Sequence, residues 1–155
     1  MTAVRDHGVR HDGIGAMLAD ARSRLDRIDG ETASREVLDG ALLVDIRPAA
    51  QRAEEGEVHP ALRPLVIERN VLEWRLDPSS EACLSQASYD ARILVLCQEG
   101  YTSSLAADAL RSLGLDATDV VGGFRAWREG GLPQACPSAS TSDGNAIGGS
   151  SVRGS

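Results

Sequence analysis

The sequence predicts an α/β fold in which a parallel β-sheet is covered by helices on both faces. The apolar runs Ala41–Ile46 and Ile93–Leu96 lack the alternation of apolar and polar residues that a half-exposed strand shows, so they are expected to be buried on both faces. Between such runs, apolar residues recur at intervals of three and four, which is typical of amphipathic helices. Strands that alternate with helices indicate βαβ units with right-handed crossovers.

The N-terminal elements follow from local signals. The spacing of apolar residues predicts an amphipathic helix within Ile14–Ile28. This helix could end before Leu25, in which case Leu25–Ile28 would form a short edge strand. A second helix is predicted over Glu31–Leu38, which has an acidic residue in its first turn and a glycine just past its end.

The first buried strand is expected to lead into a helix over Ala49–Glu55, because Pro48 suits the first position of a helix. Ser80 is expected to cap a later helix. The remaining elements before the second buried strand are a loop over 57–64, a strand over Leu65–Ile67, a turn or brief helix over Val71–Leu76 and a helix over Glu81–Ala87.

After the second buried strand, a helix is expected to begin at Thr102 and to stop at Gly114. A further strand over Ala117–Val121 and a short helix over Phe124–Glu129 complete the pattern. The two tryptophans, Trp74 and Trp127, are assigned to the core rather than to a ligand-binding surface.

Three regions are predicted along the chain. Residues 1–24 form an N-terminal extension that carries an amphipathic helix, and residues 25–133 form the folded domain. Residues 134–155 are rich in serine and glycine and have few bulky apolar residues. Such a segment cannot bury enough apolar surface to offset its ordering entropy, so it is expected to be a disordered tail, which contains Cys136.

Composition excludes several classes of function. The net charge of −7 argues against nucleic-acid binding, and the absence of lysine excludes Schiff-base chemistry. Three widely spaced cysteines make neither a disulfide framework nor a metal site, so no metal is expected. No apolar run approaches the length of a membrane span and no secretory signal follows the N-terminal charges, so a cytoplasmic location is expected.

The most informative residue is Cys97, which lies where a buried strand ends and a helix begins. The unpaired N–H groups and the dipole of a helix start favour a thiolate over a thiol, and the thiolate is the nucleophile. Gly100 can adopt the positive φ that a tightly wrapped loop needs. A second strand ends in Asp45-Ile46-Arg47, and because parallel strands present their carboxyl ends at one rim, these residues are expected near Cys97.

Three segments together resemble the single-domain members of the rhodanese-like sulfurtransferase family. They are LLVDIR over 42–47, LCQEGYTS over 96–103 and VVGGFRAWREGGLP over 120–133, and their order and spacing also match. The resemblance covers roughly residues 25–133. It implies a central parallel sheet of about five strands flanked by helices on both faces.

The resemblance also implies a chemistry. Cys97 would take sulfane sulfur from a donor such as thiosulfate or a persulfide and carry it as a covalent persulfide without any cofactor. It would then pass the sulfur to cyanide or to a thiol, either of a small molecule or of a protein. The sulfur-binding loop would comprise Gln98, Glu99, Gly100, Tyr101, Thr102 and Ser103, with backbone N–H groups from 98–102. Thr102 and Ser103 would add hydroxyl donors and cap the helix. Asp45 and Arg47 would form a supporting ion pair, and Arg52 would replace an arginine that the family often has at position 51.

Departures from the family pattern concern the substrate. Family members often carry basic residues where this chain has Gln98 and Tyr101, and Glu99 adds a negative charge. An anionic donor such as thiosulfate would be repelled, so a neutral or thiol-bound persulfide is the favoured donor. The loop over 56–64 is altered or lengthened relative to the family.

Two alternatives differ in class. Phosphatases with a related fold use Cys-x5-Arg, but the residue at that place is Ser103, so phosphatase chemistry is disfavoured. The other alternative is a non-enzymatic or regulatory domain that acts as a sulfur carrier or persulfide sensor. Such a domain would also keep Cys97, so turnover has to separate it from an enzyme.

Overall fold

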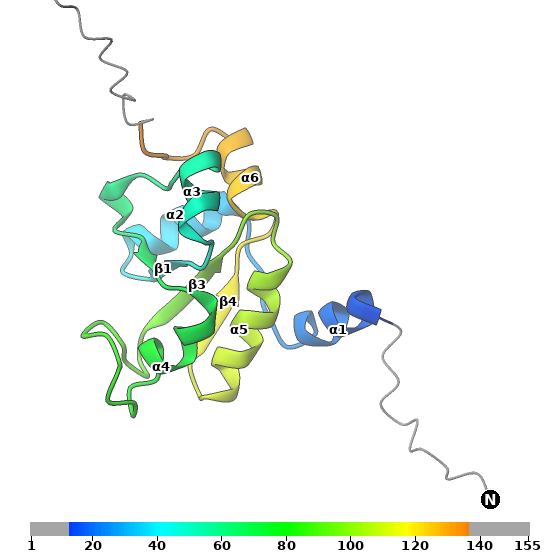
Figure 1. Cartoon of the computed structure of the whole chain (residues 1–155), viewed down its shortest axis with the longest axis vertical. Coiled ribbons are helices and arrows are strands. Elements are labelled where there is room, and N and C mark those ends of the chain that lie inside the picture. Colours follow the sequence, from blue (N-terminus) through cyan, green and yellow to red (C-terminus); the bar gives the residue numbers. More distant parts are fainter. Residues whose placement is uncertain (1–12, 137–155) are drawn as a thin grey trace, which may run out of the picture.

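The computed structural model describes residues 13–136, which form a parallel sheet between two layers of helices (Figure 1). The sheet has the order β2-β1-β3-β4, and every neighbouring pair is parallel. Its strands are β1 Leu42–Asp45, β2 Leu65–Val66, β3 Arg92–Leu96 and β4 Asp116–Asp119. The predicted α/β class is therefore confirmed, with four strands rather than about five.

The edge beside β4 explains the difference in strand number. The predicted helix ends at Arg22, and the chain then reaches the sheet only at Ile28. Ile28 forms an isolated parallel bridge with Val120, in which its N–H donates to Asp119 O at 3.3 Å and its carbonyl accepts from Val121 N at 2.8 Å. The alternative edge strand over Leu25–Ile28 is thus reduced to one bridging residue.

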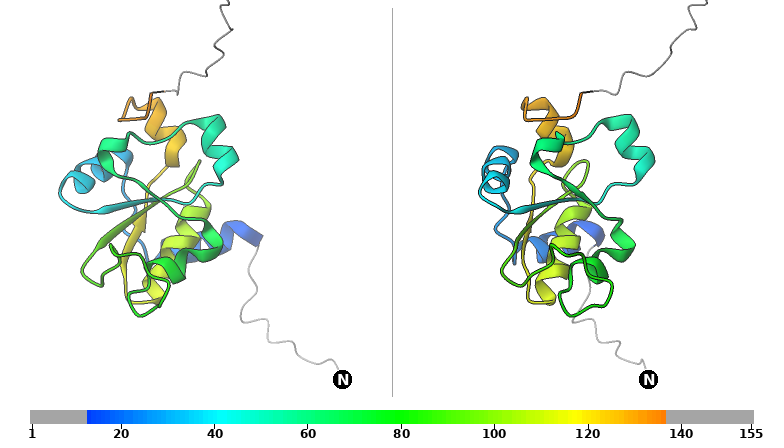
Figure 2. Two further views of the ribbon diagram at one scale, coloured as in Figure 1. Left: turned by 60° about the vertical axis from the view of Figure 1, so that its left-hand side comes forward. Right: turned by 90° about the vertical axis from the view of Figure 1, so that its left-hand side faces the viewer.

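Helices cover both faces of the sheet, as Figure 2 shows from two sides. They are α1 Gly13–Arg22, α2 Gly30–Leu38, α3 Ala49–Glu55, α4 Leu72–Leu76, α5 Thr102–Ser112 and α6 Gly123–Glu129, with short 3-10 helices at Pro60–Leu62 and Arg69–Val71. None of the helices in this part of the chain combines the length and apolar character needed to cross a membrane.

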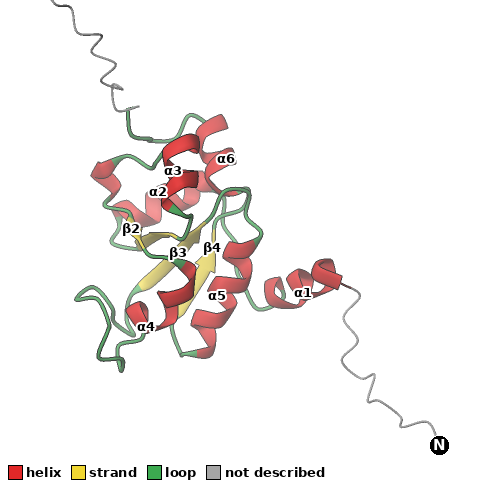
Figure 3. Cartoon of the chain, in the orientation of Figure 1, coloured by secondary structure: helices red, strands yellow, loops and turns green. Residues whose placement is uncertain are grey.

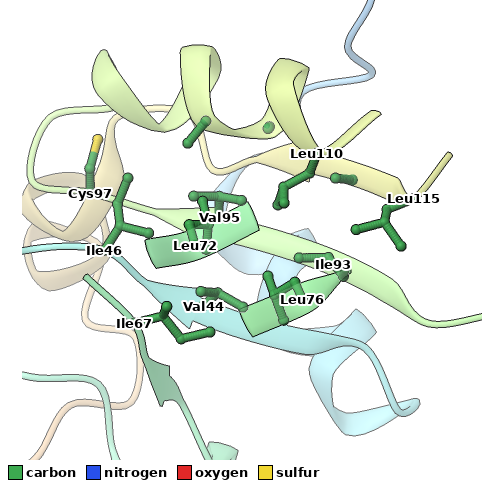
Figure 4. Packing of buried hydrophobic residues seen from close by; sticks show 13 residues of the cluster. Val44, Ile46, Ile67, Leu72, Leu76, Ile93, Val95, Cys97, Leu110 and Leu115 are labelled. Carbon is green, nitrogen blue, oxygen red and sulfur yellow. The ribbon is translucent and has the colours of Figure 1, made fainter. Parts of the chain in front are cut away.

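The core explains why β3 reads as an unbroken apolar run. Ile93 and Val95 pack into one cluster with residues of α4 and α5, whereas Leu94 and Leu96 pack into a second cluster with α2 and α6. Burial on both faces requires apolar residues at every position of the strand. Cys97 lies at one end of the first cluster, beside Ile46 (Figure 4).

One predicted helix is wrong. Glu81–Ala87 forms a series of turns between α4 and β3 (Figure 3). The Ser80 hydroxyl does accept a backbone hydrogen bond, from Ala82 N at 3.1 Å. Leu84 N, however, donates to Arg75 O at 2.8 Å instead of forming a helical bond within the segment. Serines that bond nearby backbone groups favour turns over helix, and this segment offers no apolar stripe to oppose them. Cys83 is half-buried within these turns.

The two tryptophans differ from one another. Trp127 is fully buried, as expected, and its indole N–H donates to Pro133 O at 2.8 Å. Trp74 is 58% exposed on the outer side of α4, so its assignment to the core is wrong. The short helix α4 buries Leu72 and Leu76 instead, and these residues, four apart, turn Trp74 toward solvent.

The predicted N-terminal extension and tail lie partly outside the described residues. The prediction of disorder for 137–155 and the polar N-terminus over 1–12 fall there. Within the described part, Gln134 forms an isolated antiparallel bridge with Val58, and Ala135 N donates to Glu57 O at 2.8 Å. The first residues after the predicted domain boundary therefore pair with the loop over 57–64.

Candidate active site

Cys97 occupies the floor of a loop that connects β3 to α5. Its side chain is almost fully buried, at 4% exposure. The sulfur accepts N–H bonds from Gly100 at 3.2 Å and from Ser103 at 3.4 Å, so backbone donors converge on Sγ from the middle of the loop and from the start of α5. The predicted contribution of loop amides is present at Gly100, and Ser103 adds a donor from the first turn of the helix.

Two glycines allow this loop to pack against the start of α6. Gly100 has φ +86°, and a Cβ there would lie 2.8 Å from Gly122 N. At Gly123, with φ +59°, a Cβ would lie 2.4 Å from Cys97 O. Neither position tolerates a side chain without movement of backbone. The close approach lets Phe124 N donate to Cys97 O at 2.8 Å.

On the β1 side of the loop, Asp45 and Arg47 form a buried ion pair with an Nη2–Oδ2 distance of 2.7 Å. Arg47 also donates to Gly56 O at 2.9 Å and to Gln98 Oε1 at 3.4 Å, and its guanidinium lies 4.3 Å from the ring centroid of Phe124. These contacts occupy the guanidinium of Arg47, so its charge stabilises the fold rather than being available to a ligand. The pair therefore holds the wall beside the loop.

On the β4 side, Asp119 gathers partners that local sequence patterns did not reveal. Its fully buried carboxylate accepts from the hydroxyls of Ser103 at 2.7 Å and Ser104 at 2.8 Å, and from Arg27 Nε at 2.9 Å. Arg27 and Asp119 are 92 positions apart, so no short motif could have linked them.

Two expectations for the hydroxyls are wrong. The single hydroxyl proton of Ser103 goes to Asp119, so this side chain does not donate to the sulfur. The N-cap of α5 is Tyr101, which makes no side-chain capping bond, and Thr102 is already the first helical residue. The carboxylate of Asp119 competes successfully for hydroxyl donors, because a charged acceptor makes the stronger bond.

A pocket of about 350 Å³ opens above Cys97. The predicted loop residues Gln98, Glu99, Tyr101 and Thr102 line it, together with Ile46, Arg47, Pro48, Gln51 and Glu55. Arg52 is not part of this lining, because its Nη1 donates to Glu57 at 2.7 Å and its Nε to Arg47 O at 3.3 Å. Gln51, at the position where the family often has arginine, faces the pocket instead.

The charges around the pocket are mainly negative. Arg47 pairs with Asp45 at 2.7 Å and with Glu55 at 3.3 Å, so two carboxylates share its one positive charge, and Glu99 brings a further carboxylate to the lining. Glu99 pairs with Arg125 at 3.3 Å, and both side chains are at least half exposed. The bond to Glu129, reinforced by Glu99, raises the pKa of Arg125, which keeps this residue charged. An anionic ligand would thus meet no uncommitted cation from the described lining residues.

A second cavity, of about 430 Å³, is lined by Arg24, Asp108, Arg111 and Ser112, none of which belongs to the Cys97 loop. Among residues 13–136, no group of three His, Cys, Asp or Glu side chains could hold a metal ion.

Comparison with protein families identifies this arrangement. Residues 25–130 match the family described as the rhodanese-like domain. The chain belongs to the rhodanese-like family. The match begins after α1, so the helix that carries Arg22 precedes the region shared with the family.

Two relatives of the chain come from maize, Zea mays. These proteins, adenylyltransferase and sulfurtransferase MOCS3-2 and MOCS3-1, are each 36% identical over 87 residues, which is 56% of this chain. The matched part is only 17% and 18% of their lengths, so the chain corresponds to less than a fifth of either relative.

Solved structures show the same fold. A protein of unknown function from Rhodopseudomonas palustris, described as a possible tyrosine phosphatase, is 29% identical, with a TM-score of 0.71 over 87% of this chain and 98% of that one. The polysulfide-sulfur transferase homodimer from Wolinella succinogenes has a TM-score of 0.68 over 88% of this chain and 98% of its own, at 21% identity. At that identity the second comparison supports the fold alone.

Proposed function

We propose that the protein is a sulfurtransferase that carries sulfane sulfur as a persulfide on Cys97. The observation that carries this proposal is the pair of N–H bonds that Sγ accepts from Gly100 and Ser103 at the floor of an open pocket. Donors that already point at a sulfur stabilise negative charge there without reorganisation. The sulfurtransferase relatives from maize agree with this chemistry.

Two displacements account for the transfer. The Cys97 thiolate attacks the outer, sulfane sulfur of a donor RS–SH, an Sγ–S bond forms, and the S–S bond of the donor breaks so that RS⁻ leaves with the electron pair. An acceptor thiolate or cyanide then attacks the outer sulfur, and the Sγ–S bond breaks to return the Cys97 thiolate. The sulfur moves at an unchanged oxidation level, so no external oxidant or reductant is needed.

The pocket favours a thiol-bound persulfide over thiosulfate as donor. Thiosulfate is a dianion, and the two carboxylates of the lining, Glu55 and Glu99, oppose its approach. The amides of Gln51 and Gln98 can instead bond the uncharged polar groups, such as peptide amides, of a thiol-bound persulfide. Such chemistry requires a reduced Cys97, and the cytoplasm, where thiols are kept reduced, is the proposed compartment.

Phosphatase chemistry has weaker support, although one structural neighbour is described as a possible tyrosine phosphatase. The position that would supply a phosphate-gripping arginine holds Ser103, whose hydroxyl is bound to Asp119. The cation among the pocket-lining residues is Arg47, and its ion pair with Asp45 leaves it unavailable to bind a phosphate.

Turnover assays test the proposal. The purified protein is incubated with thiosulfate and cyanide, and separately with glutathione persulfide and a thiol acceptor. The persulfide reaction is expected to be the faster one and to be abolished in Cys97→Ser. Cys83→Ser is the matched control, because Cys83 lies in the turns after α4 and outside the pocket lining. A folded wild type that forms Cys97 persulfide but turns over no acceptor would favour the sulfur carrier or sensor instead.

Donor preference can be tested at Glu99. Glu99→Lys replaces repulsion with attraction at the pocket and is expected to raise the rate with thiosulfate a few-fold at low salt. Glu129→Lys is the control, because Glu129 also pairs with Arg125 but does not line the pocket. Equal effects of the two variants would show that general surface charge, rather than Glu99, sets the response to thiosulfate.

A further inference from the structure

Two arginines that lie far from the Cys97 loop in sequence donate hydrogen bonds to its outer side. The carbonyl of Gly100 accepts from Arg22 Nη2 at 2.7 Å and from Arg27 Nη2 at 2.9 Å. The N–H of the same residue donates to Cys97 Sγ at 3.2 Å. Gly100 therefore contacts two guanidinium groups through its carbonyl and the sulfur through its N–H.

Arg22 and Arg27 differ in what balances their charge. Arg27 also binds both carboxylate oxygens of Asp119, at 2.9 and 3.2 Å. The interactions that the structure gives for Arg22 are with neutral groups: the Gly100 carbonyl, the Ser104 hydroxyl at 3.0 Å and the ring of Tyr101, whose centroid lies 5.8 Å away. Arg22 thus brings a positive charge to a loop that has no basic side chain of its own.

The place of Arg22 in the fold makes this contact distinctive. Arg22 is the last residue of α1, which lies beside α5 in Figure 1 and precedes the region matched by the family. Arg22 also reaches Tyr101, a residue of the pocket lining that is 55% exposed. One side chain from the N-terminal extension therefore contacts both the turn of the loop, at the Gly100 carbonyl, and the mouth of the pocket, at the Tyr101 ring.

We propose that Arg22 is a positioning residue for sulfur transfer at Cys97, which holds the Gly100 carbonyl so that the neighbouring N–H groups stay aimed at sulfur. Its positive charge, brought to the back of the loop, favours the thiolate and the persulfide anion over their neutral forms. This role replaces the cations absent at Gln98 and Tyr101. The inference rests on the proposed function for its effect on turnover, but its effect on the thiolate is independent of it.

The test compares Arg22→Met, Arg22→Lys and Arg24→Met with the wild type. Arg24 is the control, because it lies two positions on and pairs with Asp20 and Asp108 rather than with the loop. The first readout is the rate of Cys97 alkylation by iodoacetamide at a fixed, mildly acidic pH, followed by mass spectrometry so that Cys83 and Cys136 do not interfere. The second readout is the rate of transfer from glutathione persulfide.

Arg22→Met is expected to slow both reactions roughly three- to tenfold, the effect of losing one charge-assisted hydrogen bond. Arg22→Lys keeps the charge but has one nitrogen for two acceptors, so its rates should lie between those of Arg22→Met and the wild type. A merely structural contact would not produce this rescue. Arg24→Met should match the wild type.

Wild-type rates in Arg22→Met, or equal slowing in Arg24→Met, would overturn the inference. If Arg22→Met fails to fold, Arg22→Gln, which retains an amide donor for the Gly100 carbonyl, replaces it and is expected to slow alkylation in the same direction. If the wild type itself transfers no sulfur, the proposed function fails, while the ranking of alkylation rates still decides for or against Arg22.

Discussion

Two buried carboxylates flank the Cys97 loop, Asp45 as the last residue of β1 and Asp119 as the last residue of β4. Asp45 forms an ion pair with one arginine, Arg47, whose side chain is 1% exposed. Asp119 accepts hydrogen bonds from two hydroxyls and forms an ion pair with Arg27. The Arg27 side chain is 19% exposed and also donates to the carbonyl of Gly100 in the loop. The first carboxylate holds the wall of the pocket, whereas the second holds the loop that presents N–H groups to the sulfur.

This difference separates stability from reactivity. A buried charge that loses its only full counter-ion is costly, so Asp45 should matter most for folding. Asp119 has a partner with some access to water, but another of its partners, Ser103, also donates its backbone N–H to Sγ. Replacing each aspartate by asparagine removes the same unit of charge with little change of shape, which makes the two sites directly comparable.

The largest loss of stability is expected for Asp45→Asn. The guanidinium of Arg47 would remain buried with only Glu55, at 3.3 Å, as a charged partner. The free energy of unfolding should fall by roughly 3–5 kcal/mol, the usual result of removing one partner of a buried ion pair. Urea unfolding followed by circular dichroism measures this loss. A loss no larger than that of an exposed aspartate would contradict the structural role assigned to this pair.

Asp119→Asn should cost less stability but more reactivity. Losing charged acceptors for Ser103, Ser104 and Arg27 is expected to lower the free energy of unfolding by about 1.5–3 kcal/mol. Because the loop is then held less firmly, alkylation of Cys97 and sulfur transfer should slow more than in Asp45→Asn. Both rates are measured under conditions in which each variant is fully folded. If Asp45→Asn slows alkylation more than Asp119→Asn does, then Asp45, rather than Asp119, is the carboxylate that holds the sulfur-binding loop.

The same contrast shows which parts of the site a sequence can reveal. Asp45 and Arg47 lie two positions apart, and Cys97, Gly100 and Ser103 lie within one short loop, so their geometry is a local pattern. The interactions that support the loop from behind, by contrast, span 73 to 92 positions. Only the folded chain brings them together, and arginines are too frequent in this sequence to single out two of them.

The fold was predictable for a related reason. Buried parallel strands such as β3 need apolar residues on both faces, and this requirement is visible in sequence as an unbroken apolar run. The failures occurred where local preference is weak. The turns around Leu84 carry no apolar stripe, and the orientation of Trp74 depends on which face of the five-residue helix α4 meets the sheet.

The smallest effect is expected for Asp108→Asn, because this carboxylate is only partly buried and its arginine partner is half exposed. Arg24 donates to Asp108 at 2.7 and 2.8 Å, and these bonds hold the pKa of the Asp108 carboxyl below its ordinary value. A carboxylate whose pKa is lowered by folding stabilises the protein above its ordinary pKa, and this contribution is lost as pH falls through the lowered value. The Arg24 side chain is 49% exposed, so screening by water keeps the contribution to a small fraction of that of Asp45. Urea unfolding of the wild type and of Asp108→Asn should therefore differ slightly at neutral pH and converge in acid. A difference that persists in acid would mean that Asp108 stabilises the fold through something other than its charge.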